Sequence, residues 1–124
     1  MPMQTSSEDY PKRGEFYIAD LDPGFGREMH KKRPVLIISD NIINSTRPHA
    51  VVIPASTIVP KTITPEMIYL GRPKGFNEES ILLPIFIRSI DQDRFIRKIG
   101  RVSKKKLLQI EKALNMILGL NLEG

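Results

Sequence analysis

The chain has 124 residues, which is the length of a single domain and enough to bury a hydrophobic core without crosslinks. It has no cysteine, so disulfide bonds and thiolate metal sites are excluded. Its net charge is +5 at pH 7, and the distribution of that charge says more about a partner than the sum does. No apolar run is long enough to span a bilayer, and the polar first residues lack the order of a secretory signal. We therefore expect a cytoplasmic protein with no membrane partner.

The first half of the chain predicts two strands around a charged loop. Residues 1–12 are polar and are expected to form a flexible tail. Glu15 to Leu21 is aromatic and aliphatic and predicts a strand. A charged, glycine-containing loop follows, from Asp22 to Pro34. Val35 to Ser39 predicts a short central strand, and the polar stretch from Asp40 to Pro48 predicts turns.

Further strands are predicted in the second half. Ala50 to Thr57 reads as a strand that ends in two hydroxyl residues, and Met67 to Leu70 as a shorter one. Ser80 to Ile90 predicts a longer strand that contains a proline, which implies a sheet edge or a bulge. Arg94 to Val102 is expected to add a last strand.

The end of the chain has helical periodicity. Between Ser103, a plausible N-cap, and Gly119, a plausible stop, apolar residues recur at the spacing of one helix face. These residues are Leu107, Ile110, Leu114 and Ile117. The predicted fold is therefore one β-rich (α+β) domain over residues 13–120. It is a small antiparallel barrel of five to seven strands, with the helix 103–119 packed on it.

The basic residues are concentrated in two windows. Eleven of the nineteen lysines and arginines lie in residues 27–34 and 92–106. If the fold brings these windows together, they form a groove suited to a polyanion such as RNA. If it does not, they are two solvated basic surfaces.

The residues present limit the chemistry. Dinucleotide-binding, phosphate-loop, zinc-ligand and serine-hydrolase spacings are all absent, and we expect no metal and no cofactor. The chain offers arginines, hydroxyl residues and a loop glutamate instead. Such residues suffice to cleave RNA, because RNA carries its own nucleophile, the 2′-hydroxyl. An enzyme needs to remove that proton, stabilise the phosphorane charge and protonate the leaving 5′-oxygen.

Six short motifs follow one another in a fixed order, namely Arg13-Gly14-Glu15, Leu21-Asp22-Pro23, Gly26-Arg27-Glu28, Arg33-Pro34-Val35-Leu36, Pro54-Ala55-Ser56-Thr57 and Ile87-Arg88-Ser89-Ile90-Asp91. In order and spacing they resemble the PemK/MazF toxins of bacterial toxin–antitoxin modules. The resemblance implies an SH3-like barrel, a homodimer and a metal-independent, sequence-selective endoribonuclease acting on single-stranded RNA. The implied products carry a 2′,3′-cyclic phosphate and a 5′-hydroxyl. The implied partner is an antitoxin whose acidic segment occupies the RNA site.

The same resemblance assigns catalytic roles to three residues. Arg33 matches the catalytic arginine, Ser56 matches the catalytic threonine or serine, and Glu28 matches a glutamate associated with proton transfer. Each residue also has a structural interpretation. Arg33 would brace the loop, Ser56 would cap a strand end, and Glu28 would be a solvated acid.

Further residues are predicted to bind RNA, namely Arg27, Lys31, Lys32, Thr57, Arg88 and Phe86. Arg88 has an alternative partner in Asp91. His30 and His49 are expected to be surface residues. Met29 stands where the family commonly has glutamine, and Ile85-Phe86 where many members have a polar pair. These departures predict a different RNA sequence preference, or base binding that relies more on stacking than on hydrogen bonds, or weak or lost activity.

Two other functions fit a basic barrel. The first is a non-catalytic inhibitor of a protein target, as in the related CcdB toxins. The second is a nucleic-acid-binding barrel that does not cleave. A pair such as Arg33 and Ser56 argues against the first. Tight, salt-sensitive RNA binding without a cleavage product would support the second.

Overall fold

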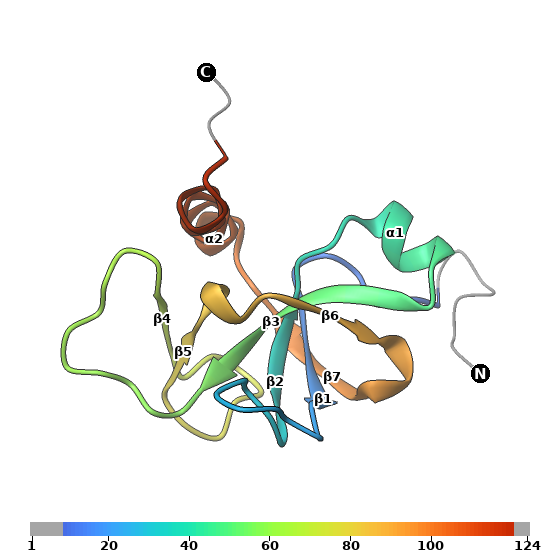
Figure 1. Ribbon diagram of the computed structural model, residues 1–124, viewed down its shortest axis with the longest axis horizontal. Helices are drawn as coiled ribbons and strands as arrows, with labels where there is room; N and C mark the ends of the chain where they lie inside the picture. The colour runs from blue at the N-terminus through green and yellow to red at the C-terminus, as the bar shows by residue number, and fades with distance from the viewer. Residues whose placement is uncertain (1–8, 121–124) are drawn as a thin grey trace.

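A curled antiparallel sheet and one long helix form the architecture of the computed structural model, which describes residues 9–120 (Figure 1). Its strands are β1 (Glu15–Asp20), β2 (Lys32–Ile37), β3 (His49–Ser56), β4 (Ile68–Gly71), β5 (Ser80–Leu82), β6 (Arg88–Asp91) and β7 (Phe95–Arg101). The helices are α1 (Asn41–Thr46), α2 (Lys104–Leu118) and the 3-10 turns η1 (Pro84–Phe86) and η2 (Gln92–Arg94).

The strands lie in the order β4-β5-β3-β2-β1-β7, and β6 pairs with β3 beside this path. The pairs are antiparallel throughout the part of the chain that the structure describes. The sheet curls into a half-barrel, and this confirms the predicted small barrel with a C-terminal helix.

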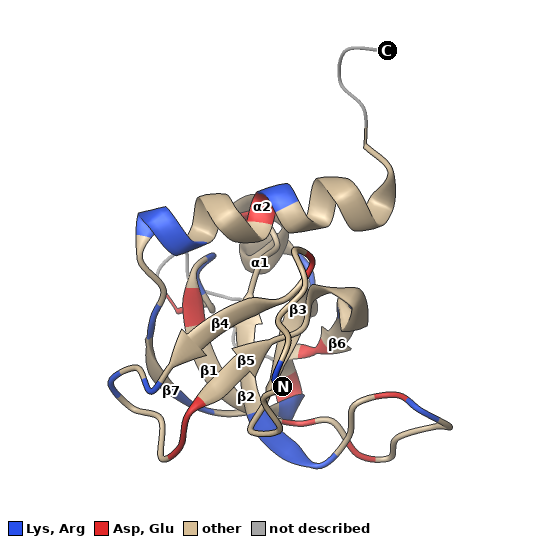
Figure 2. Ribbon diagram, turned by 90° about the vertical axis from the view of Figure 1, so that its left-hand side faces the viewer, with Lys and Arg blue, Asp and Glu red and all other residues tan. Residues whose placement is uncertain are grey.

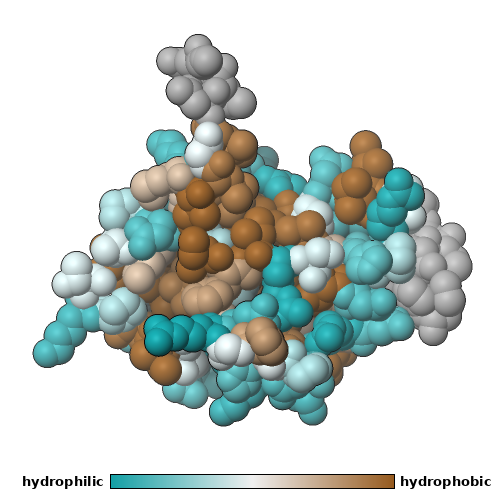
Figure 3. All heavy atoms as spheres, viewed as in Figure 1, coloured by the Kyte–Doolittle hydropathy of each residue, from teal (hydrophilic) through white to brown (hydrophobic). Residues whose placement is uncertain are grey.

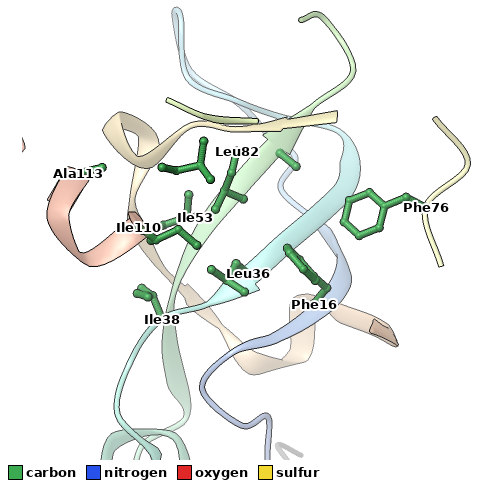
Figure 4. Packing of buried hydrophobic residues seen from close by; sticks show 10 residues of the cluster. Phe16, Leu36, Ile38, Ile53, Phe76, Leu82, Ile110 and Ala113 are labelled. Atoms are coloured by element: carbon green, nitrogen blue, oxygen red, sulfur yellow. The ribbon is translucent and has the colours of Figure 1, made fainter. Parts of the chain in front are cut away.

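Both faces of the sheet are apolar. Side chains alternate between the two faces along each strand, and consecutive residues of the central strands are apolar. On β2, Leu36 points into one cluster, whereas Val35 and Ile37 point into the other. The first cluster fills the space between the sheet and α2, with Ile110 of the helix packed against it (Figure 4). The second cluster lies on the opposite face, where Met29 of the charged loop packs against it. The loop is thereby seated on the sheet.

The predicted C-terminal helix is confirmed at both ends. The Ser103 hydroxyl accepts a hydrogen bond from the backbone N–H of Lys106, and Gly119 ends the helix in the left-handed conformation. The Lys106 Nζ donates to the carbonyl of Tyr69 at 2.8 Å, which ties the first turn to β4. The outer side of the helix carries exposed apolar residues, and Figure 3 shows apolar side chains gathered below it. The exposed ones are Leu108, Met116 and Leu118, with Leu120 after the helix.

Two element predictions were wrong. The expected strand from Ser80 to Ile90 is divided into β5, the turn η1 and β6, because Pro84 lacks an N–H and begins the 3-10 turn. The stretch 40–48, expected to be turns, contains α1, whose first turn is capped by the Asp40 carboxylate accepting from Ile42 N–H. In addition, β2 begins at Lys32 rather than at Val35.

The predicted tail 1–12 falls largely outside the described residues, which begin at residue 9. Pro11 is fully buried, so the chain packs on the domain before Arg13. None of the described helices has the length and apolar character that crossing a membrane requires.

Candidate active site

Arg33 lies where the charged loop enters β2, and its side chain is fixed by two backbone carbonyls. Its Nε donates to the carbonyl of His30 at 2.8 Å, and its Nη1 donates to the carbonyl of Ala55 at 3.1 Å. Other N–H groups of the guanidinium fork are left to bind a ligand. Partial burial lowers the pKa of Arg33 from its usual value, while the nearby Asp22 carboxylate acts in the opposite direction.

Ser56 lies on the neighbouring strand. β3 pairs with β2, and the carbonyl of Ala55, the residue before Ser56, accepts from Arg33 Nη1 at 3.1 Å. Ser56 is buried, and its hydroxyl oxygen accepts from the N–H of Ile58 at 3.0 Å. Its O–H therefore remains available as a donor. The two residues with predicted catalytic roles thus come from adjacent strands.

The loop 22–31 is closed at its base by polar contacts. The Asp22 carboxylate accepts from the backbone N–H of Lys31 at 2.8 Å and lies 3.4 Å from Nδ1 of His30. The N–H of Leu21 donates to the carbonyl of Lys31 at 3.0 Å. Arg94 adds a clamp from the end of η2, since its Nη1 donates to the carbonyls of Asp20 and Asp22 at 2.9 and 2.7 Å. These contacts hold the His30 carbonyl that orients Arg33.

A cleft of about 250 Å³ opens beside Arg33. It is lined by Lys32, Thr57 and, from β7, Arg97. Figure 2 shows lysines and arginines on β7 and on the segment that enters β2. The fold thus brings residues of the two basic windows together, and Arg97 is a cleft residue that we did not single out from the sequence. Its position in the second basic window was the only signal.

Glu28 and Arg88 line a second hollow of about 270 Å³, which does not include Arg33. Glu28 accepts from the N–H of Phe25 at 3.1 Å within the loop. Among the described residues Arg88 forms no ion pair with Asp91, and its Nη1 is buried without a hydrogen-bond partner. Arg88 pairs with Val52 on β3, roughly 13 Å along that strand from Ser56.

The sequence from residue 12 to residue 118 matches the model of a protein family described as the PemK-like, MazF-like toxin of type II toxin–antitoxin systems. The chain belongs to the PemK/MazF toxin family. It is 34% identical over 110 residues to endoribonuclease EndoA of Bacillus subtilis, an alignment that covers 88% of this chain and 95% of the relative. It is 32% identical to endoribonuclease MazF of Staphylococcus epidermidis, with 89% and 92% covered.

Solved structures of PemK/MazF toxins share the fold. MazF from Deinococcus radiodurans superposes with a TM-score of 0.77 at 20% identity, covering 90% of this chain and 98% of that chain. A mycobacterial endoribonuclease in complex with its cognate antitoxin superposes with a TM-score of 0.73 at 23% identity, covering 90% and 97%. At these identities the likeness establishes the curled sheet with its C-terminal helix.

The other predicted RNA contacts of this PemK/MazF chain are distributed around the two openings. Lys32 and Thr57 line the cleft, whereas Phe86 lines the hollow. Arg27 and Lys31 are exposed on the loop and line neither opening. Within residues 9–120, no group of three metal-ligating side chains is arranged to hold a metal ion.

Proposed function

We propose that this PemK/MazF toxin is a metal-independent, sequence-selective endoribonuclease that cleaves single-stranded RNA. The observation that carries the proposal is the Arg33 guanidinium, held by two carbonyls next to Ser56 at the edge of a basic cleft. The activity named for the relatives EndoA and MazF supports it.

Charge stabilisation by Arg33 and Ser56 is the core of the proposed reaction. The 2′-oxygen of one nucleotide attacks the adjacent phosphorus, the bond to the 5′-oxygen breaks, and the products are a 2′,3′-cyclic phosphate and a 5′-hydroxyl. Arg33 and the Ser56 O–H donate to the non-bridging oxygens as negative charge builds up. Arg33 is also the proposed donor of the proton to the leaving 5′-oxygen.

Glu28 is the proposed base that removes the 2′-hydroxyl proton. Its carboxylate is bonded within the loop and lines the hollow rather than the cleft. A base role therefore requires the loop 22–31 to shift when RNA binds, as active-site loops commonly do. Arg88 and Phe86 in the hollow would hold a further part of the RNA through charge and stacking.

The direct test is cleavage of a long single-stranded RNA in the presence of EDTA, with the cut sites and end groups mapped. We expect cuts at one recurring short sequence, with cyclic phosphate ends. Arg33→Ala should slow cleavage by about 10²–10³, the usual effect of losing one electrostatic stabiliser. The control Lys105→Ala removes an exposed charge that lines neither opening and should cleave normally. Intact RNA across many sequences would refute the activity.

The proposed protein partners are an acidic antitoxin and a second copy of the chain. A structural neighbour is an endoribonuclease in complex with its cognate antitoxin, and an acidic segment would suit the cationic cleft of this chain. Exposed apolar residues on α2, of which Met116 lines a groove together with Met67 and Tyr69, support a homodimer through this helix. The cytoplasmic location stays a prediction.

Light scattering tests the dimer. Met116→Asp should yield monomers, because it places a charge in the proposed apolar interface. Ile58→Asp changes another exposed apolar residue, 82% accessible and outside that groove, and should leave the dimer intact. A monomeric parent protein, or a dimer that survives Met116→Asp, would contradict this interface.

A further inference from the structure

The floor of the cleft beside Arg33 is a row of residues across three strands. Ile18 of β1 pairs with Pro34 of β2 on one side and with Arg97 of β7 on the other. Paired side chains lie on the same face of the sheet, so Arg97 and Pro34 lie on either side of the apolar Ile18. Arg97 is exposed and forms no ion pair among the described residues. Its charge is therefore available to a ligand.

The opposite wall of the cleft is the segment 72–79, the β4–β5 loop, which is held rigidly. Phe76 is only 8% exposed and packs edge-on against Phe16, with ring centroids 5.0 Å apart. Gly75 has φ +94° and lies so close to β7 that a Cβ there would be 2.1 Å from the carbonyl oxygen of Ile99. The loop is thus fixed on the sheet, and it presents Asn77 and Glu78 to the cleft.

The cleft carries positive charge on its strands and a negative charge on the β4–β5 loop. Lys32, Arg33 and Arg97 are cationic, and Glu78 is the acid among the lining residues. Phosphate would be attracted to the cationic side, whereas a carboxylate repels phosphate and accepts from N–H groups. Adenine, cytosine and guanine each carry an amino group that donates, while uracil offers a single ring N–H. The cleft therefore has separate places for a phosphate and for a base with an amino group.

We propose that this cleft binds the nucleotide next to the cleaved bond, with Arg97 and Lys32 on its phosphate and Asn77 and Glu78 on its base. The subsite rests on the proposed endoribonuclease function and adds the residues that select the sequence. Its preformed wall lets recognition proceed without reordering the β4–β5 loop, so little conformational entropy is lost there on binding.

The first test is kinetic and uses Arg97→Ala on a short RNA that contains the mapped cut site. We expect KM to rise about threefold to fivefold with kcat nearly unchanged, since one exposed phosphate contact is lost. The dependence of log(kcat/KM) on log salt should become shallower by about 0.7, the value for one phosphate of a single strand. Lys105→Ala is the charge-matched control and should show neither change.

The second test uses Glu78→Ala on RNAs that differ only in the nucleotides flanking the cut. The parent protein should cleave RNAs with an amino-bearing base at one flanking position about tenfold faster than those with uracil, and Glu78→Ala should abolish this difference. Glu79→Ala, whose carboxylate instead bonds the Tyr69 hydroxyl, should retain it. The melting temperatures of all four variants should match that of the parent, because Arg97, Glu78 and the two control residues are exposed.

The outcomes separate the two proposals. If the parent cleaves RNA but Arg97→Ala behaves like Lys105→Ala and the base preference survives Glu78→Ala, the subsite is refuted and the activity stands. If the parent cleaves nothing, the endoribonuclease proposal fails. The cleft as a binding site is then decided by fluorescence anisotropy with labelled single-stranded RNA of mixed sequence. Weaker binding by Arg97→Ala supports it, and unchanged binding overturns it.

Discussion

The β4–β5 loop lines the cleft, whereas the loop 22–31 leads into β2 and lines the hollow, and the two loops are held in different ways. The loop 22–31 is fastened by polar contacts at its base, through the carboxylate of Asp22 and the guanidinium of Arg94. The β4–β5 loop is fastened by the buried ring of Phe76 and by the close approach of Gly75 to β7. The second loop is held by a buried ring. The first has one partly buried apolar contact, Met29 on the second cluster, and is otherwise held by hydrogen bonds that can exchange with water.

The two loops have different roles in the proposed reaction. Glu28 lies on the polar loop, which must shift to bring a base to the RNA, and the tip residue Phe25 is 83% exposed. The preformed β4–β5 loop instead carries Asn77 and Glu78, the proposed readers of the base. Recognition is thus assigned to the rigid wall, and conformational change to the polar loop.

The largest expected effect tests the apolar anchor. Phe76→Ala removes a buried aromatic ring and should lower the free energy of unfolding by about 3–5 kcal/mol. Phe25→Ala is the matched change in the other loop and should stay within about 0.5 kcal/mol, because Phe25 is exposed. Denaturant unfolding measures both. Equal effects would remove the distinction between the loops.

A pair of glycines sharpens the comparison. Gly75 and Gly26 both have positive φ, but a Cβ at Gly75 meets the Ile99 carbonyl and one at Gly26 meets nothing within 4 Å. Gly26→Ala should therefore cost about 1–2 kcal/mol for the left-handed backbone alone. Gly75→Ala should lower the free energy of unfolding by about a further 1–3 kcal/mol, because the added methyl group overpacks against the Ile99 carbonyl. Thermal unfolding in parallel would detect the difference, and identical melting temperatures would contradict it.

The polar clamp should have a smaller global effect and a clear local one. Arg94→Ala loses two hydrogen bonds to carbonyls and should reduce stability by about 1–2 kcal/mol. Amide hydrogen exchange of Leu21 and Lys31 should accelerate, because their bonds close the base of the loop. Arg47→Ala, an exposed arginine after α1, is the control. Unchanged exchange in Arg94→Ala would show that the clamp does not hold the loop.

The smallest effect is spectroscopic and reports on the apolar cluster beneath the polar loop. Burial, together with Glu15, raises the pKa of Tyr17 from 10.0 to about 12. The folded state therefore keeps this proton longer than the unfolded state, and stability falls as the pH rises from about 10 through about 12. The pKa of Tyr69 is also raised, chiefly by its hydrogen bond to Glu79, so the titration is compared in a Tyr69→Phe background. There, ultraviolet titration of the tyrosines should show a late step near pH 12 that disappears when Tyr17→Phe is added. A late step that survives Tyr17→Phe would contradict its assignment to Tyr17.

Local sequence pattern predicted the elements that carry a long, repeated signal. The helix α2 has an apolar stripe, an N-cap serine and a terminal glycine, and all three act as expected. The six-residue α1 has no such stripe, so its single capping residue Asp40 was not recognised. The division at Pro84 was missed because branched residues on both sides mimic one continuous strand.

The catalytic roles of the site residues stay a prediction. The motif order pointed to Arg33 and Ser56, and the sheet register places them on adjacent strands. Arg97 and the residues Asn77 and Glu78 join the cleft only through the pairing of β7 with β1 and the packing of Phe76 on Phe16. Contacts between such distant segments leave no local pattern in the sequence.

The measurement that tests the central claim most directly is cleavage of an RNA in which the nucleotide before the cut carries 2′-deoxyribose. The proposed reaction predicts that this RNA binds with the affinity of the all-ribose strand, competes with it and is not cut at that position. Cleavage of the deoxy-substituted RNA at the same bond would contradict attack by the 2′-hydroxyl, and with it the roles assigned to Arg33 and Ser56.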